Sequence, residues 1–235
     1  ADERKGVKAA LKSAARRFAA EDAEAARLEG MYSFQAKLAG GGIAVGLDEV
    51  GRGPVAGPLA IGAVVLPDDP RVEGVNDSKQ LSAERREEIA AVVREVAIAW
   101  DIEYIQPQEI DEHGMTWALR TANLRAIAAI EEQLSAKGAS LDAVLLDGNA
   151  QHLDAREVNI VKGDGKCASI AAASIIAKVD RDALMCRYAE RFPHYGFESN
   201  KGYASAEHIE AIKQYGLSPV HRASFCRAWT QETLF

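Results

Sequence analysis

The sequence predicts an α/β fold in which strands and helices build a buried sheet. Apolar, β-leaning runs at residues 43–48 and 59–66 have the length of buried strands, and residues 96–104 alternate large apolar with smaller or polar side chains. Longer, alanine-rich amphipathic segments follow at residues 116–136 and 168–192. Three adjacent strands followed by helices favour a meander that continues into α/β units.

The N-terminal segment is expected to be helical and separate from the main domain. Residues 7–38 are rich in Ala, Glu, Arg and Lys and predict one or two amphipathic helices, and the glycines of residues 39–42 interrupt the pattern. The chain therefore divides into a helical N-terminal extension, residues 1–42, and a main domain, residues 43–235. The last part of that domain, residues 194–235, has the pattern of loops and short helices.

The other elements follow from caps and breakers. Ser82 is placed to cap a helix over residues 83–95, which has acidic residues near its start. Residues 143–148 and 158–161 are short apolar runs that predict two more strands. Pro193 ends the last long helix.

Composition limits the class of protein. The 235 residues are 48% hydrophobic and 27% charged, as in an ordinary globular chain. No apolar run approaches the ~18 residues of a membrane span, and the charged N-terminus does not resemble a secretory signal. The cysteines Cys167, Cys186 and Cys226 are odd in number and lack C-x-x-C spacing. We expect them to be reduced thiols in a cytoplasmic protein, and we expect a monomer.

The charge distribution is uneven. The formal net charge is −7, of which residues 1–42 carry +2 and residues 43–235 carry −9. A protein that binds nucleic acid through charge alone would be basic. If this chain handles nucleic acid, it needs a local basic surface or metal ions that cancel its acids.

Four acidic residues stand at or just after predicted strand ends. Asp48, Glu49 and Asp147 end strands, and Asp164 lies in the polar loop that follows another. Each aspartate alone could be a turn or cap residue, but sites in α/β sheets gather at such strand ends. Clustered carboxylates repel one another, and hard divalent cations relieve that repulsion. Two such ions would neutralise four carboxylates, which predicts a two-metal centre for phosphoryl transfer.

Seven segments carry a resemblance to a known family. They occur in the same order as in that family over nearly all of residues 43–225, and their combination is specific although each is short. The segments are GLDEVGRGPVAGP (46–58), NDSKQLS (76–82), LLDG (145–148), VKGDGK (161–166), AASIIAKVDRD (172–182), NKGYASAEH (200–208) and GLSPVHRASF (216–225). On these residues the chain resembles the bacterial type 2 ribonucleases H, the ribonuclease HII family.

The resemblance implies a fold and a set of site residues. The fold is ribonuclease H-like, a central mixed five-stranded sheet with flanking helices and a C-terminal helical region. The family's metal-binding acids, which hold two Mg²⁺ or Mn²⁺ ions in the active complex, fall on Asp48, Glu49, Asp147 and Asp164. Its substrate-binding positions fall on Gly51, Arg52, Gly53, Lys79, Lys166 and Tyr203.

In the family, the segment that matches Gly51-Arg52-Gly53 presents backbone groups to the 2′-hydroxyl and phosphate of a ribonucleotide. Glycine suits that task because the absent Cβ lets the backbone approach a ligand closely. The matching tyrosine, Tyr203, stacks on the deoxyribose that follows the ribonucleotide. Without the resemblance, Tyr203 would be interpreted as a half-buried packing residue, and Lys79 and Lys166 as solvated surface lysines.

The implied activity is that of a metal-dependent endoribonuclease. It cleaves RNA in RNA/DNA hybrids and at single ribonucleotides embedded in duplex DNA, on the 5′ side of the ribonucleotide, and leaves 3′-hydroxyl and 5′-phosphate ends. This activity serves ribonucleotide removal and primer removal. One alternative is a ribonuclease HIII-like hybrid nuclease, but that family has threonine at Arg52 and a larger N-terminal domain. A non-catalytic nucleic-acid-binding module is disfavoured because unneutralised acids repel phosphate.

The remaining candidates are weaker. Asp180 and Asp182 lie beside Lys178 and Arg181 in a predicted helix and are expected to form structural ion pairs. His208 is expected on a helix surface without a role.

The chain ends in QETLF, in which Gln231, Leu234 and Phe235 resemble the peptide that binds a sliding clamp. The clamp peptide prefers an apolar residue where this chain has Glu232, so the expected contact is weak. The alternative is an amphipathic tail packed on the domain.

Overall fold

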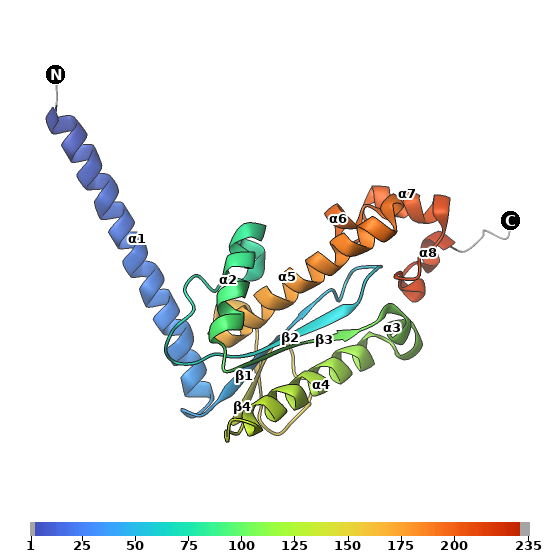
Figure 1. The fold of residues 1–235 in the computed structure, drawn as a ribbon, viewed down its shortest axis with the longest axis horizontal. Helices are drawn as coiled ribbons and strands as arrows, with labels where there is room; N and C mark the ends of the chain where they lie inside the picture. The colour runs from blue at the N-terminus through green and yellow to red at the C-terminus, as the bar shows by residue number, and fades with distance from the viewer. Residues whose placement is uncertain (1–2, 231–235) are drawn as a thin grey trace.

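The computed structural model describes residues 3–230, which form a mixed five-stranded sheet with helices on both faces (Figure 1). β1 pairs antiparallel with β2 and parallel with β4, and the full strand order is β3-β2-β1-β4-β5. The predicted sheet, with its antiparallel meander of three strands, is confirmed. The strands are β1 (Ala44–Val50), β2 (Leu59–Val65), β3 (Ala99–Ile105), β4 (Ala143–Asp147) and β5 (Glu157–Ile160).

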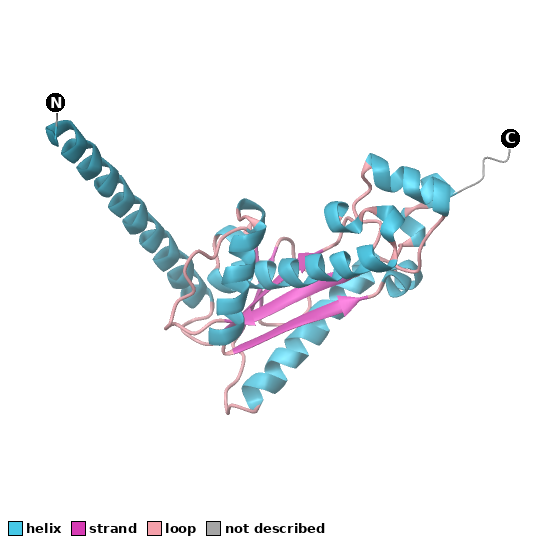
Figure 2. Ribbon diagram, turned by 45° about the horizontal axis from the view of Figure 1, so that its top comes forward, coloured by secondary structure: helices cyan, strands magenta, loops and turns pink. Residues whose placement is uncertain are grey.

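The helices sandwich the sheet, with α4 on one face and α5 and α2 on the other (Figure 2). The alternation of side chains along the central strands explains this layering: Leu47 and Ile61 pack toward α4, whereas Val64 packs toward α5. Within the described residues the α-helices are α1 (Glu3–Leu38), α2 (Ala83–Val96), α3 (Pro107–His113), α4 (Met115–Ser135), α5 (Ala168–Arg191), α6 (Phe197–Asn200), α7 (Ala206–Tyr215) and α8 (Arg227–Thr230).

Small residues let α5 lie close to the sheet. A Cβ on Gly46 would lie 2.3 Å from the backbone nitrogen of Ile170, and one on Gly62 would lie 2.2 Å from the carbonyl oxygen of Ala173. Every residue of the first part of α5, 168–177, is buried. This close approach explains the alanine-rich sequence of α5, and it places the polar residues further along the helix beside the end of β1.

Most sequence boundaries agree with the structure. Ser82 caps α2 as predicted, since its hydroxyl accepts a hydrogen bond from the backbone N–H of Arg85 at 3.2 Å. β3 begins at Ala99 rather than at residue 96, because α2 continues through Val96. α3 was not predicted, although Pro107 at its first turn and a capping box are start signals.

α1 is a single continuous helix that joins the rest of the molecule only through its second half (Figure 1). Leu28, Met31 and Tyr32 are buried, and the Tyr32 hydroxyl accepts a hydrogen bond from the N–H of Val72 at 3.0 Å. The side-chain oxygen of Gln35 accepts one from the N–H of Ser169, at the start of α5, at 2.9 Å. Within residues 3–230, no helix combines the length and apolarity needed to cross a bilayer.

The C-terminal region covers the far end of α5 and the loop between β1 and β2. A small apolar core that includes Val55, Met185 and Phe197 joins these segments. Backbone hydrogen bonds join them too: the N–H of Val55 donates to Gly202 at 2.9 Å, and the N–H of Arg222 donates to Val55 at 2.8 Å. Segments far apart in sequence therefore meet beside the end of β1.

Candidate active site

Three parallel strands bring the predicted acids to one edge of the sheet. β1 and β4 pair with Leu47 opposite Leu146, so the next residues, Asp48 and Asp147, lie side by side. β5 runs parallel to β4, and Asp164 follows it in the turn Gly163–Gly165. Asp48, Glu49, Asp147 and Asp164 are called the carboxylate edge below.

The carboxylates of β1 and β4 are held by near neighbours. The Oδ1 atom of Asp48 accepts a hydrogen bond from the N–H of Glu49 at 2.8 Å, and Glu49 pairs with the Arg52 guanidinium at 3.3 Å. The Oδ1 atom of Asp147 accepts one from the N–H of Gly163 at 2.6 Å. Among residues 3–230, no three acidic, histidine or cysteine side chains stand in a geometry that would hold a metal ion together. Sharing one ion therefore requires some of these side chains to turn from their present partners.

The electrostatics of the carboxylate edge favour a bound cation. Burial, together with the nearby charges of Asp147, Glu49 and Asp164, raises the pKa of Asp48 to about 8, although a hydrogen bond from Ser174 acts in the opposite direction. Burial is also the main cause of the raised pKa values of Glu49 and Asp164. Oxygen donors that hold protons only because their charges are uncompensated are suitable ligands for a hard divalent ion. The donor set thus fits the metals that the sequence predicted.

Nine of the ten predicted site residues line one pocket beside the carboxylate edge. They are Asp48, Glu49, Gly51, Arg52, Gly53, Lys79, Asp147, Asp164 and Tyr203, and Ser78, Ser174, Lys178 and Arg181 join them. Lys79 lies close enough to lower the pKa values of Glu49 and Asp164. Lys166 is the exception, because its ammonium group turns back to donate to the carbonyl of Val161 at 2.7 Å.

The loop after β1 faces Tyr203 across the pocket. Gly51 has a φ of +85°, and a Cβ there would lie 2.1 Å from Nε of Arg181, so only glycine fits. A Cβ on Gly53 would lie 3.7 Å from the Tyr203 ring. The Tyr203 side chain is 52% exposed. About half of the residue is therefore open to a ligand, while the other half packs against the chain.

Two buried arginines hold this loop in place. Arg222 is fully buried and donates hydrogen bonds to the carbonyls of four loop residues, Gly51, Arg52, Pro54 and Gly57, at 2.6–3.0 Å. Arg181 donates to the carbonyls of Ala56, Pro58 and Lys201 at 2.9–3.2 Å. Burial lowers the pKa of both, that of Arg222 to about 9. Arg181, Arg222 and these carbonyls are called the arginine cradle below.

The arginine cradle was missed from sequence. Arg181 was expected in an ion pair, but it binds carbonyls instead, while Asp180 pairs with Arg94 and Lys178 pairs with Asp182 at 2.7 Å. Arg222 was not predicted to have a role, although it lies within GLSPVHRASF, one of the segments that carry the family resemblance.

The expectation of a surface position for His208 was wrong. His208 is fully buried, because it shares the inner face of α7 with Ala211 and Ile212. Its Nδ1 lies 2.8 Å from the carbonyl oxygen of Tyr203, and its Nε2 lies 2.9 Å from Nε2 of His221. The histidine pair therefore supports the backbone that carries Tyr203.

Other expectations concern single residues. The three cysteines are free thiols, as expected. Gln231, Leu234 and Phe235 lie outside the described residues.

Family models and curated proteins match this chain. Residues 45–228 match the family described as "Ribonuclease HII", and residues 1–39 match "Ribonuclease HII N-terminal domain". Ribonuclease HII of Clostridium acetobutylicum is 41% identical over 232 residues, which are 96% of this chain and 88% of that protein. Ribonuclease HII of Ruminiclostridium cellulolyticum is 43% identical over 212 residues, 89% of this chain and 81% of that protein.

Solved structures agree with these matches. Ribonuclease H2 of Pyrococcus horikoshii OT3 has a TM-score of 0.66 at 28% identity and covers 79% of this chain and 96% of its own. The RNase HII in a PCNA:RNase HII complex from Archaeoglobus fulgidus has a TM-score of 0.65 at 29% identity, with coverage of 81% and 98%. With the family matched over most of its length, this chain belongs to the ribonuclease HII family and is a ribonuclease H, an endonuclease that acts on RNA in RNA/DNA duplexes.

Proposed function

We propose that this ribonuclease H cleaves on the 5′ side of a ribonucleotide, both in RNA/DNA hybrids and at single ribonucleotides embedded in duplex DNA, and leaves 3′-hydroxyl and 5′-phosphate ends. The supporting observation is that the carboxylate edge and the loop Gly51–Gly53 line the same pocket as an open Tyr203 ring. The cellular task is removal of misincorporated ribonucleotides and of primers in the cytoplasm. Free thiols agree with a reducing compartment.

The carboxylate edge would hold two divalent ions, Mg²⁺ or Mn²⁺. Support comes from its all-oxygen donor set and from the raised pKa of Asp48, since both favour a hard cation. When bound, such ions activate water and stabilise the charge that develops during in-line hydrolysis of a phosphodiester. The protein's own contribution is to place three carboxylates at neighbouring strand ends and a fourth, Asp164, in the turn after β5.

Recognition of the ribonucleotide would fall to the opposite side of the pocket. The Gly51–Gly53 loop offers backbone groups to the 2′-hydroxyl, which is the atom that distinguishes RNA from DNA. Tyr203 would stack on the next sugar, with its backbone supported by His208. Lys79 and the exposed guanidinium of Arg52 would contact phosphates, and Lys166 would contact the backbone after release from Val161.

A mapped cleavage reaction tests the proposal. Duplex DNA with one central ribonucleotide is incubated with protein and Mg²⁺ or Mn²⁺, beside an all-deoxy duplex of the same sequence and a full RNA/DNA hybrid. We expect a single cut 5′ of the ribonucleotide, with a 3′-hydroxyl on one product. Cleavage of the hybrid alone would favour the ribonuclease HIII-like alternative. Cleavage on the 3′ side, or a 2′,3′-cyclic phosphate, would exclude the proposed chemistry.

We also propose a weak sliding-clamp contact through Gln231, Leu234 and Phe235. The similar archaeal enzyme named above was solved as a complex with PCNA, which supports a clamp as partner for this chain. The apolar pair at the chain end offers two anchors for an apolar groove. Purified clamp is titrated with this protein and with a version that lacks residues 231–235. Equal binding by both versions, or binding by neither, would contradict the proposal.

A further inference from the structure

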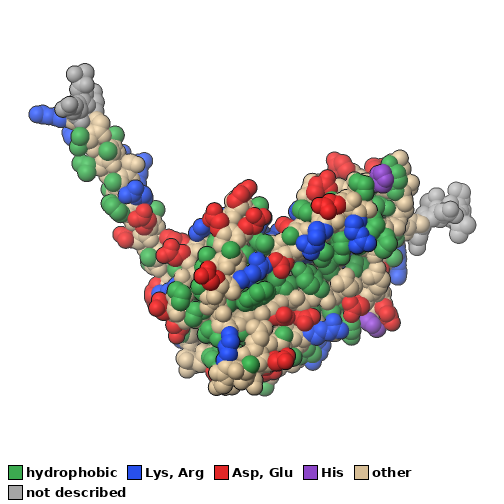
Figure 3. Space-filling view, in the orientation of Figure 1, with side chains coloured by type: hydrophobic (Ala, Val, Ile, Leu, Met, Phe, Trp, Pro, Cys, Tyr) green, Lys and Arg blue, Asp and Glu red, His purple; other side chains and the backbone are tan. Residues whose placement is uncertain are grey.

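The first half of α1 is a basic segment that projects away from the catalytic domain (Figure 1). Between residues 4 and 20 the chain has six Lys or Arg residues and no Asp or Glu. Figure 3 shows basic side chains along this segment and acidic ones nearer its base. Residues 4–20 are called the basic arm below. It contrasts with the main domain, residues 43–235, whose net charge is −9.

Four of the arm's charges form one stripe. Arg4, Lys8, Lys12 and Arg16 are exposed and follow one another at intervals of four residues, so they share a face of the helix. Like charges at this spacing repel one another and destabilise a helix. Helix stability therefore does not explain the stripe, whereas a polyanion laid along it would turn the repulsion into attraction.

The enzyme's substrate is such a polyanion. The carboxylate edge and the acidic main domain repel phosphates, so binding to a duplex beyond the cleavage site needs a basic surface elsewhere. We propose that the basic arm binds the phosphate backbone of the duplex outside the cleavage site. At 1.5 Å per residue the arm extends about 24 Å, which matches roughly seven base pairs. This inference rests on the family's action on duplexes and not on the roles of single carboxylates.

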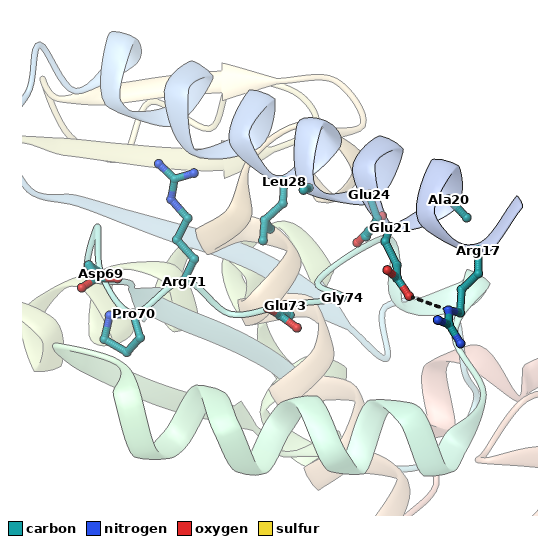
Figure 4. A pocket seen from close by; sticks show the side chains of 11 residues that line it. Arg17, Ala20, Glu21, Glu24, Leu28, Asp69, Pro70, Arg71, Glu73 and Gly74 are labelled. Carbon is teal, nitrogen blue, oxygen red and sulfur yellow. Dashed lines mark ion pairs between the residues drawn. The ribbon is translucent and has the colours of Figure 1, made fainter. Parts of the chain in front are cut away.

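The proposed contact with the phosphate backbone ends at the base of the arm. There α1 and the segment Asp69–Gly74 enclose a groove (Figure 4). Acids outnumber bases in its lining, and Arg17, on another face than the stripe, pairs with Glu21 at 3.4 Å. An anionic backbone is therefore accommodated along the stripe and not in the groove.

The arm also has an exposed apolar stripe. The alternative to duplex binding is that a second copy of this chain docks on this stripe. Val7, Leu11 and Phe18 are 58%, 64% and 55% exposed and lie on a different face from the basic stripe. Separate faces allow separate tests, because each stripe can be removed without touching the other.

Binding of the full chain to a ribonucleotide-free DNA duplex of about 20 base pairs, in EDTA, tests the proposal. The stripe variant is Arg4→Gln, Lys8→Gln, Lys12→Gln and Arg16→Gln, in which glutamine preserves helix propensity. We expect at least a tenfold loss of affinity at about 0.1 M salt. The slope of log affinity against log salt should fall by about 3 to 4, as for the loss of four phosphate contacts.

A matched variant separates position from net charge. It removes four exposed basic residues elsewhere, Lys137, Arg191, Lys213 and Arg227, and should retain most of the affinity and slope. A third variant, Val7→Gln, Leu11→Gln and Phe18→Gln, should bind the duplex as the wild type does.

Three outcomes would overturn the proposal. One is equal binding by the stripe variant and the wild type. Another is loss of binding only in the apolar variant, together with loss of a dimer in sedimentation. The third is wild-type binding to phosphatidylserine vesicles and not to DNA. At low salt the stripe variant should still cut at a lone ribonucleotide, so a failure of the proposed cleavage is distinguishable from a failure of the arm.

Discussion

The two sides of the pocket carry buried charge of opposite sign. The carboxylate edge gathers four acids, and burial raises the pKa values of Asp48, Glu49 and Asp164. The arginine cradle buries Arg181 and Arg222, and burial lowers their pKa values. Within the described residues neither arginine has an ion-pair partner. Both sides thus contain ionisable groups that have lost much of the water that would solvate their charged forms.

The two sides resolve this problem differently. Arg222 distributes its charge over five hydrogen bonds to four carbonyls, so it is saturated and fixed. Asp48 has one backbone donor and a hydrogen bond from Ser174, and Asp147 has one backbone donor, so both carboxylates keep acceptor positions open. A buried ionisable group whose hydrogen bonds are all made stabilises the fold, whereas one that keeps free acceptor positions is available to bind a ligand such as a cation. This contrast explains why adjacent segments of the chain serve architecture and chemistry separately.

The largest expected effect comes from the carboxylate edge. Asp48→Asn should lower cleavage by about a thousandfold or more, because it removes an oxygen ligand at the centre of the cluster. The fold should persist, and the melting temperature without metal should stay level or rise, since the neutral amide relieves repulsion. Single-turnover cleavage and thermal melting, each with and without Mg²⁺, measure both effects. Near-normal turnover at saturating Mg²⁺ would contradict the assignment.

Substitution of Arg222 in the arginine cradle should change both the stability of the fold and the specificity of cleavage. Arg222→Met leaves four carbonyls without their donor, at a cost on the order of 3–5 kcal/mol in unfolding free energy. Arg222→Lys keeps the charge but reaches fewer carbonyls, so it should fold with a lower melting temperature. Its cleavage should fall more at a lone ribonucleotide than in a hybrid, because the loop that reads a single sugar is loosened. An equal loss on both substrates would show that the loop is held by other contacts.

Substitution of Tyr203 tests whether its exposed ring contacts the substrate. Tyr203→Ala should slow cleavage at a lone ribonucleotide by about 10- to 100-fold, as for the loss of one aromatic stacking contact. The melting temperature should change little, because the side chain is 52% exposed. Tyr203→Phe is the matched control and should retain most activity. A much lower melting temperature with unchanged specific activity would support the packing interpretation instead.

The sequence was informative where function depends on local pattern. Apolar runs and one alternating stretch predicted the five strands. The acids at or just after strand ends predicted the carboxylate edge, because parallel strands deliver their carboxyl ends to one side. The Ser82 cap and the glycine at residue 51 are also local signals. The side-chain direction of Lys166 was not predictable, since the lysine could reach either the pocket or the carbonyl of Val161.

Polar contacts between residues far apart in the chain could not be predicted from one sequence. Arg222 and Gly51 are 171 residues apart, and a guanidinium that binds carbonyls leaves no charge partner to suggest the pairing. The burial of His208 was accessible, because His208, Ala211 and Ile212 have the spacing of one helix face. Its pairing with His221 was not, since His221 comes from another segment.

The smallest expected effect concerns the histidine pair behind Tyr203. Burial, with the neighbouring His208, lowers the pKa of His221 to about 4, and burial lowers that of His208 as well. A histidine that is harder to protonate when folded stabilises the fold above its unfolded pKa, about 6.5, and loses that contribution as the pH falls. At pH 5.5 the loss of stability from His221 is on the order of 1 kcal/mol.

Asp48 has the opposite effect on the pH dependence of stability, because its raised pKa makes acidification stabilising. The measurement is therefore made in the Asp48→Asn background, where melting between pH 7.5 and 5.5 should show the loss and His221→Gln should flatten it. An unchanged slope after His221→Gln would mean that the pair does not set the acid sensitivity of the region that carries Tyr203.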